Sequence, residues 1–193
     1  MTDRRVAPVL LLALALAASP LAADRKIDLL NLTLSPELAS WLVGAHARLA
    51  SKAEQKEFLA LRDDAAALAF IDRFWEKRDP DPGRPGNPLR EQAEQRAAEA
   101  DRRFTEAGYA GRRTDRGTIF VLYGEPGEVT HEPGDFKGEP PVEVWTYPKT
   151  AAVGLEGKRP EPRYRFIQQG DLTIFYAPGV ARQRRPETAT PFP

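Results

Sequence analysis

The spacing of apolar residues changes near Gly108, and this change limits the fold more than any other feature of the chain. Before it, apolar residues recur every three or four positions, which is typical of helices that bury one face. After it, short apolar or alternating runs are separated by glycine and proline, as in strands and turns. This order predicts an α+β fold, with N-terminal helices packed on a small C-terminal antiparallel β-sheet. We expect the helical part over about 35–107 and the β part over about 117–177.

Four helices are expected in the first part, each opened by a side chain that can accept a hydrogen bond from the first helical turn. In chain order, these caps are Ser35, Ser51, Asp63 and Asn87. Proline follows at positions 36 and 88, where it fits the first helical position. Glu54 completes a capping box with Ser51. The first helix is expected to continue to Leu49 and the fourth to about residue 106.

The third helix has the widest apolar stripe and is expected to form the centre of the helical core. Its members are Leu68, Phe70, Ile71, Phe74 and Trp75. Burial of such side chains contributes roughly 1.5–3 kcal/mol each, so a Trp and Phe stripe is more often core than a ligand site. The fourth helix instead carries Ala93, Ala97 and Ala100 before Phe104, a narrow stripe that lets a partner element approach closely.

The second part predicts strands joined by turns. Thr118–Tyr123 is a continuous apolar and β-branched run, which favours a buried strand, and Gly124–Gly127 follows it as a turn. Val142–Tyr147 alternates between two faces. Tyr164–Ile167 and Leu172–Tyr176 are two further strands, expected to pair through a tight hairpin.

The N-terminus has the composition of a secretory signal peptide over residues 1–23. Two arginines in Met1–Arg5 precede the apolar run Val9–Ala18, a Ser-Pro step breaks it, and small residues allow cleavage after Ala22 or Ala23. The alternative is a transmembrane anchor, but a span needs about 20 apolar residues. The sequence therefore predicts export to a periplasmic or extracellular location, with no membrane span left after cleavage.

Composition excludes several classes of function. The chain has no cysteine, which excludes lipid attachment, disulfides, thiolate metal sites and cysteine nucleophiles. It has 28 basic and 28 acidic side chains, and this balance gives no general attraction to nucleic acid or anionic lipid. We expect one domain over 24–181, followed by a disordered tail over 182–193 that is rich in arginine and proline.

Several motifs between Phe74 and Tyr147 resemble those of the GWxTD domain family of bacterial proteins, named for a Gly-Trp-x-Thr-Asp motif. The matching pieces are Phe74–Pro80, Asn87, Gly111–Gly117, Ile119–Pro126 and Val144–Tyr147. Arg112 stands where the family has its signature tryptophan, and Tyr109 is the nearby aromatic residue that could replace it. The resemblance implies an exported protein and supports the fold, and it implies no particular chemistry.

The segment Thr114–Gly117 is the first candidate site, at the entry to the predicted strand. Asp115 and Arg116 could bind a polar ligand or a peptide terminus, and Gly117 would allow a sharp turn. The alternative interpretation is structural, because Thr and Asp side chains in such loops bond to neighbouring backbone N–H groups. We favour the structural interpretation.

Arg78 and Asp79 form a second candidate, a charged pocket with Asp81 and Arg84 at the end of the third helix. The favoured alternative is a turn locked by side-chain bonds and an ion pair. Tyr123 is expected at a strand-ending turn, and Trp145 on an aromatic strand.

The two histidines complete the candidate groups. His46 lies beside an apolar stripe, where a packed or surface histidine is expected, and His131 is followed by Glu132 and Asp135. No pair has the tight spacing of a dedicated metal site, so neither a metal nor another cofactor is predicted.

Three functional hypotheses remain. The first is a non-enzymatic domain that contacts a protein partner in the cell envelope through its aromatic strands, Trp145–Tyr147 and Ile174–Tyr176. The second is a hydrolase that uses Asp115 with Arg116 and Asp79. The third is a small-ligand sensor with an apolar pocket between the helices and the sheet.

Overall fold

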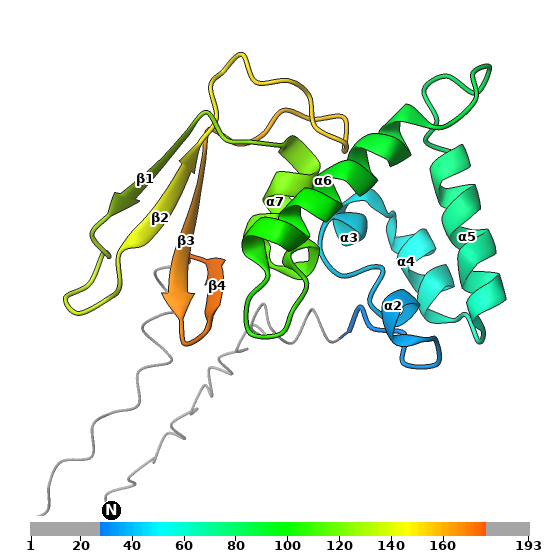
Figure 1. The fold of residues 1–193 in the computed structure, drawn as a ribbon, viewed down its shortest axis with the longest axis horizontal. Helices are drawn as coiled ribbons and strands as arrows, with labels where there is room; N and C mark the ends of the chain where they lie inside the picture. The colour runs from blue at the N-terminus through cyan, green and yellow to red at the C-terminus, as the bar shows by residue number, and fades with distance from the viewer. Residues whose placement is uncertain (1–27, 177–193) are drawn as a thin grey trace, which may run out of the picture.

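The computed structural model describes residues 28–176, in which helices and one antiparallel sheet lie side by side (Figure 1). The predicted signal peptide, 1–23, and the predicted tail, 182–193, lie outside the described residues. In chain order the helices are α2 (Pro36–Ala39), α3 (Ala45–Leu49), α4 (Lys52–Leu59), α5 (Asp64–Glu76), α6 (Pro88–Phe104), the 3₁₀ turn η1 (Gly111–Arg113) and α7 (Asp115–Tyr123). The strands are β1 (Glu128–Glu132), β2 (Val142–Thr146), β3 (Arg163–Gln169) and β4 (Leu172–Phe175).

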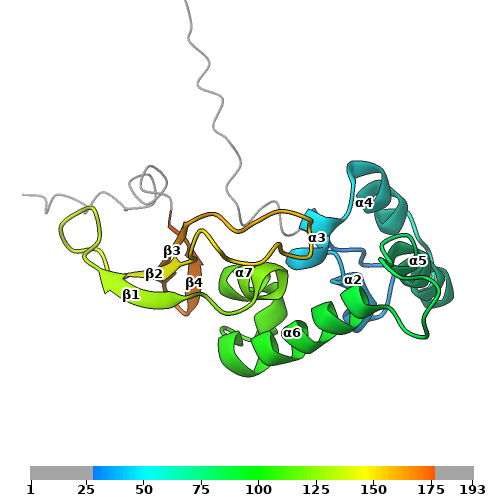
Figure 2. The same ribbon diagram turned by 90° about the horizontal axis from the view of Figure 1, so that it is seen from above.

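The elements form three groups along the long axis of the molecule. The sheet lies at one end, α6 and α7 lie in the middle, and α2 to α5 lie at the other end (Figures 1 and 2). The predicted α+β fold, with N-terminal helices followed by an antiparallel sheet, is confirmed. Within 28–176, no helix combines the length and the apolar character that a membrane span requires.

Three of the four predicted caps are present as hydrogen bonds. Ser51 and Glu54 form the capping box, Asp63 accepts from the Ala66 N–H, and Asn87 accepts from two amides at the start of α6. The helix predicted from Ser35 to Leu49 is wrong as one unit, because it is divided into α2 and α3.

The division between α2 and α3 has a steric cause at Gly44. Its φ of 94° lies in the left-handed region, and a Cβ atom there would lie 2.5 Å from the Arg112 carbonyl oxygen. Only glycine permits this close approach of the chain to η1 without strain. The break therefore positions α3 against the start of α7 instead of extending the first helix.

The aromatic core of the helical part is centred on α5, as predicted, with one error. Phe70, Phe74 and Trp75 are buried and pack with Trp41 and Phe58. Leu68 was expected on the same stripe, but its side chain points outward and the residue is 54% exposed. The alanine stripe of α6 is buried as predicted.

The strand predicted over 118–123 is wrong: these residues belong to helix α7. The side-chain oxygen of Thr114 caps this helix by accepting from the Gly117 N–H at 3.1 Å. Every residue from Gly117 to Leu122 is buried, because α7 is enclosed by α3, α6 and β4. A helix that is buried on all sides has no apolar periodicity, so its sequence looks like a buried strand. The helical part thus extends to Tyr123.

The sheet has the order β1-β2-β3-β4, with every neighbouring pair antiparallel. Strands β2, β3 and β4 were predicted from the sequence, and the structure confirms them. Gly170 lies in the predicted tight turn between β3 and β4. Strand β1 was not predicted.

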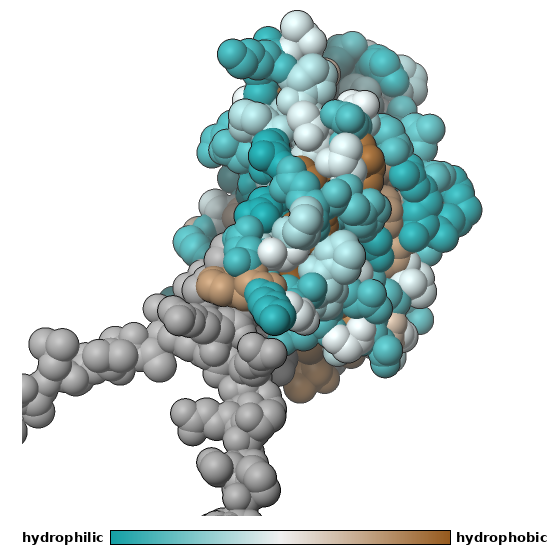
Figure 3. Space-filling model, turned by 90° about the vertical axis from the view of Figure 1, so that its left-hand side faces the viewer, coloured by the Kyte–Doolittle hydropathy of each residue, from teal (hydrophilic) through white to brown (hydrophobic). Residues whose placement is uncertain are grey.

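The two faces of the sheet differ. The inner face carries Trp145 and Phe166 and packs against the α6–α7 layer, where Phe104 contacts the Trp145 ring. The outer face carries Val142, Val144 and Ile167. Although these three are buried, the surface above them is mostly hydrophilic, with only narrow apolar strips (Figure 3).

Candidate functional site

The candidate residues at the start of α7 connect this helix to the edge strand β4. The Phe175 N–H donates to Asp115 Oδ2 at 2.8 Å, although Asp115 and Phe175 are 60 positions apart in the chain. The Thr173 N–H donates in the same way to Glu106 Oε1 at 3.0 Å. Two carboxylates from the α6–α7 region therefore take the place of a further strand beside β4.

Arg116 lies at the centre of a partly buried charge network beneath the sheet. Its guanidinium donates to Glu106 at 2.8 Å and to Glu143 at 3.2 Å, and it lies over the Phe104 ring at 5.4 Å. Glu143 also accepts from the Trp145 indole N–H at 2.6 Å. The network joins α7, the segment after α6, and β2, so Arg116 holds the helical layer and the sheet together.

The glycines of this segment are required by close packing. A Cβ atom on Gly117 would overlap the carbonyl of Gly111, and one on Gly111 would overlap the carbonyl of Ala100 in α6. Thr114 donates to the Gly111 carbonyl at 2.8 Å as well as capping α7. These contacts support the structural interpretation of Thr114–Gly117 over ligand binding.

Arg112, at the position of the family's tryptophan, also makes an internal contact. Its backbone N–H and its guanidinium both bond to Asp101 of α6, with a salt bridge of 2.6 Å to Oδ2. Tyr109 does not substitute for the missing aromatic ring in the core, because it is 56% exposed. The side chain at this position therefore forms an ion pair at the helix surface.

The second candidate, at the end of α5, joins three helices. Arg78 donates to Glu54 at 2.7 Å and to the carbonyls of Leu49 and Phe74. The hydrogen bonds from Arg78 hold the pKa of Glu54 well below its usual range. The predicted ion pair with Asp79 is wrong, because Arg78 pairs with Glu54 of the capping box. Asp79 accepts from the Asp81 N–H at 2.9 Å and so forms the predicted turn.

The two candidate regions are not brought together. Asn87, at the start of α6, donates to the Trp75 carbonyl near Asp79, whereas Phe104, at the other end of α6, lies under Arg116. A helix of 17 residues is about 25 Å long. Asp79, near the start of α6, and Asp115, next to Arg116 near its end, therefore lie far apart. Figure 1 shows that the end of α5 and the start of α7 lie at different ends of α6.

Tyr123 and Trp145 lie in separate aromatic clusters. Tyr123 ends α7, where its hydroxyl bonds to Glu156 and burial raises its pKa above the usual range. It stacks on Tyr164 at a centroid distance of 5.9 Å. Trp145 is 2% exposed, so it is a core residue and not a surface for a partner.

Three acidic residues in these networks were missed by the sequence analysis as partners. Glu54 was recognised only as part of a capping box, and Glu106 gave no local signal. Glu143 was detectable in principle, because it shares the inner face of β2 with the buried Trp145 and must therefore have a partner.

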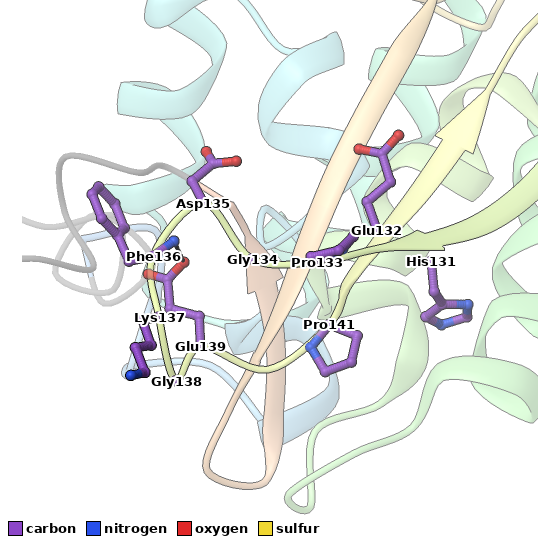
Figure 4. A pocket seen from close by; sticks show the side chains of 10 residues that line it. All are labelled: His131, Glu132, Pro133, Gly134, Asp135, Phe136, Lys137, Gly138, Glu139 and Pro141. Carbon is purple, nitrogen blue, oxygen red and sulfur yellow. Dashed lines mark hydrogen bonds between the residues drawn. The ribbon is translucent and has the colours of Figure 1, made fainter.

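An open cavity of about 630 Å³ is formed by His131–Glu139 with Pro141, in and beside the β1–β2 loop (Figure 4). Its acidic side chains have partners within the domain: Asp135 bonds to Arg165, and Glu139 accepts from the Tyr176 hydroxyl. Among residues 28–176, no three His, Asp or Glu side chains lie close enough together to hold a metal ion.

A smaller cavity, about 70 Å³ in volume, lies between α2, α3 and α6. His46 lines it, stacks on Trp41 at 4.4 Å, and makes a 2.8 Å hydrogen bond to the Trp41 carbonyl through Nδ1. Burial lowers the pKa of His46 to about 4, so the imidazole is neutral at pH 7. This histidine is therefore packed against Trp41, which is one of the two predicted alternatives.

The fold and these networks define an α+β domain in which a Gly-x-x-Thr-Asp segment fixes one helix between a second helix and a sheet edge. The chain belongs to the GWxTD domain family, whose model matches residues 39–167. Neither the curated proteins nor the solved structures include a significant match to this chain.

Proposed function

We propose that the protein is an exported, non-enzymatic domain that binds another protein of the cell envelope. Export is supported by the signal-peptide composition of residues 1–23. A binding role is supported by the way the candidate side chains are used. Asp115, Arg116 and Arg78 each bond to another part of the same domain, and Asp79 forms a local turn with the Asp81 N–H.

The observation that carries the binding role is the difference between the two edges of the sheet. The β4 edge is closed by Asp115 and Glu106, as described above. Within the described residues, by contrast, nothing pairs with the outer edge of β1. An unpaired strand edge is a template for another chain.

The other two hypotheses receive less support. The hydrolase needs Asp79 close to Asp115 and Arg116, but these lie at opposite ends of α6. The sensor needs an apolar pocket between the helices and the sheet. The small cavity that the helices do form is instead beside α2, with Arg112 and His46 in its wall.

Export and binding can be tested on the same tagged full-length chain. We expect the chain in the extracytoplasmic fraction, at a mass reduced by cleavage after Ala22 or Ala23. Retention in the cytoplasm at full mass would contradict export. For binding, a photo-crosslinking amino acid replaces Val129 in one variant and Leu68 in a control, because these side chains are 46% and 54% exposed. We expect a discrete protein adduct from position 129 only.

A further inference from the structure

The hydrogen-bonding pattern of the sheet shows which groups of β1 point outward. In an antiparallel strand, both backbone groups of a residue point to the same side, and the side alternates along the chain. The Tyr147 N–H donates to the Pro162 carbonyl, just before β3, so every second residue back from Tyr147 faces β3. Val144 therefore faces β1, and its register partner Thr130 faces it in return.

By the same alternation, Val129 and His131 direct their N–H and C=O groups away from the sheet. These four groups form two rungs of a hydrogen-bond ladder without a partner among residues 28–176. The same alternation at the other edge makes Thr173 and Phe175 the outward residues of β4, and both of their amides are bonded to carboxylates.

The side chains around β1 indicate what kind of strand fits there. Val129 lies opposite Trp145 on the inner face and is 46% exposed, so it offers apolar surface to a neighbouring side chain. Glu128 and Glu132 lie on the outer face at the two ends of the strand. Glu132 pairs with Arg163, and no ion pair is formed by Glu128 within the described residues. The edge therefore carries two glutamates on one face and an exposed valine, with His131 two residues further on, on the other.

We propose that β1 accepts an extended segment of a partner protein as a fifth strand of the sheet, a binding mode known as β-strand addition. This proposal rests on the proposed binding function. The segment places an apolar side chain beside Val129 and a lysine or arginine next to it in sequence, beside Glu128. Opposite charges directly across two strands stabilise their pairing. The backbone bonds supply affinity, and the basic-apolar step supplies specificity.

A second copy of this chain fits the edge less well. The antiparallel register that uses both outward residues of each copy pairs Val129 with His131 of the second copy. That register also places Glu128 opposite Glu132 of the second copy, twice. Like charges directly across two strands are destabilising, so the acidic edge disfavours self-pairing and favours a basic segment.

The test uses the full chain and two synthetic peptides. The first contains Arg-Val-Thr-Val-Arg, which places arginine beside Glu128 and Glu132 in either strand direction. The second contains Glu-Val-Thr-Val-Glu. We expect the basic peptide to bind at least tenfold more tightly than the acidic one, as measured by fluorescence anisotropy. Equal binding of the two peptides would overturn the charge preference.

Proline substitution separates the edge from the rest of the strand. Val129→Pro removes one outward N–H and leaves the β1–β2 ladder intact, since proline is tolerated on sheet edges. We expect it to weaken binding of the basic peptide about tenfold, the loss that corresponds to roughly 1.4 kcal/mol. The control Val129→Thr keeps the N–H and should bind within threefold of the unchanged chain. Unchanged binding by Val129→Pro would overturn strand addition.

The crosslinked adduct at position 129 identifies the natural occupant. The proposal is supported if the adduct contains a basic extended segment of an envelope protein and if His131→Pro prevents its capture. A crosslink to residues 177–193 of the same chain, or to a second copy, overturns it. If envelope proteins are captured from other surface positions and not from position 129, β-strand addition fails but the binding function stands. If no position captures a protein, the binding function fails.

Discussion

At the β4 edge of the sheet, the outward amides of Thr173 and Phe175 donate to Glu106 and Asp115, whereas at the β1 edge the corresponding groups of Val129 and His131 have no such acceptors among the described residues. Both edges end the same four-stranded sheet. The difference is produced by Asp115 in the capped first turn of α7 and by Glu106 in the segment after α6, which both lie against β4. These two carboxylates therefore decide which edge of the sheet is closed.

The comparison also explains why the motif residues are built into the fold. An open strand edge is an aggregation hazard that proteins cover, shorten or charge. This chain covers β4 with carboxylates, and it places glutamate at both ends of the five-residue β1. The motif thus directs any strand addition to β1 by excluding it from β4.

The largest effect is expected from breaking the Arg116 network. Arg116→Met leaves Glu106 and Glu143 partly buried without their cation, and removal of one partner from such a network costs about 3–5 kcal/mol in the free energy of unfolding. Urea unfolding followed by circular dichroism measures this loss. Arg102→Met is the matched control, because its ion pair with Glu99 is exposed and should contribute less than about 1 kcal/mol. Equal losses for the two variants would show that the network does not hold the layers together.

Opening the β4 edge directly is expected to have the next largest effect. Asp115→Ala removes the acceptor of the Phe175 N–H and a negative charge from the first turn of α7, at a combined cost of about 2–3 kcal/mol. Asp115→Asn keeps an acceptor oxygen and should lose less than half as much. The same urea measurement compares them, and a loss for Asn as large as that for Ala would contradict the role of the acceptor.

A change of pH tests the stability of the helical part independently of the two sheet edges. The pKa of His46 is lowered to about 4, below its ordinary value near 6.5. Between pH 6.5 and 4, the unfolded chain therefore binds more protons than the folded chain. Stability is therefore lost as pH falls from 6.5 towards 4, by about 2 kcal/mol between pH 7.5 and 5.0.

The matched variant for this test is His46→Phe, which keeps a ring beside Trp41 and does not titrate. Its free energy of unfolding should change much less between pH 7.5 and 5.0. If both proteins lose the same amount, His46 is not the group responsible.

The smallest effect on stability is expected at the β1 edge itself. Val129→Pro removes an N–H that has no partner in the described structure, so the free energy of unfolding should change by less than about 1 kcal/mol. Thr130→Pro is the comparison, because it removes an N–H that faces β2 and should cost about 1–3 kcal/mol. A larger loss for Val129→Pro than for Thr130→Pro would mean that Val129 faces β2 and that Thr130 faces outward.

The local part of the fold was predictable from the sequence, and the contacts between distant segments were not. Asn87 and Ser51 cap their helices as predicted because capping depends on residues within one turn. The run from Thr118 to Tyr123 was predicted as a strand because full burial removes the helical period. Its helical state depends on enclosure by α3, α6 and β4, which no local pattern records.

The candidate site shows the same division. The structural role of Thr114 was predicted from its loop position, and the structure supports it. The bond from Asp115 to Phe175 spans 60 positions, and neither residue signals the other. Strand β1 was missed because an edge strand that buries little apolar surface has only weak alternation, with a burial pattern that never reaches the core.

Hydrogen exchange of four backbone amides tests the contrast between the edges most directly. We predict that the amide protons of Thr173 and Phe175 exchange slowly, because each is bonded to a carboxylate, and that those of Val129 and His131 exchange at rates close to those of an exposed chain. Nuclear magnetic resonance on the full chain without a partner resolves the four amides. Protection of Val129 and His131 equal to that of Thr173 and Phe175 would contradict the open β1 edge.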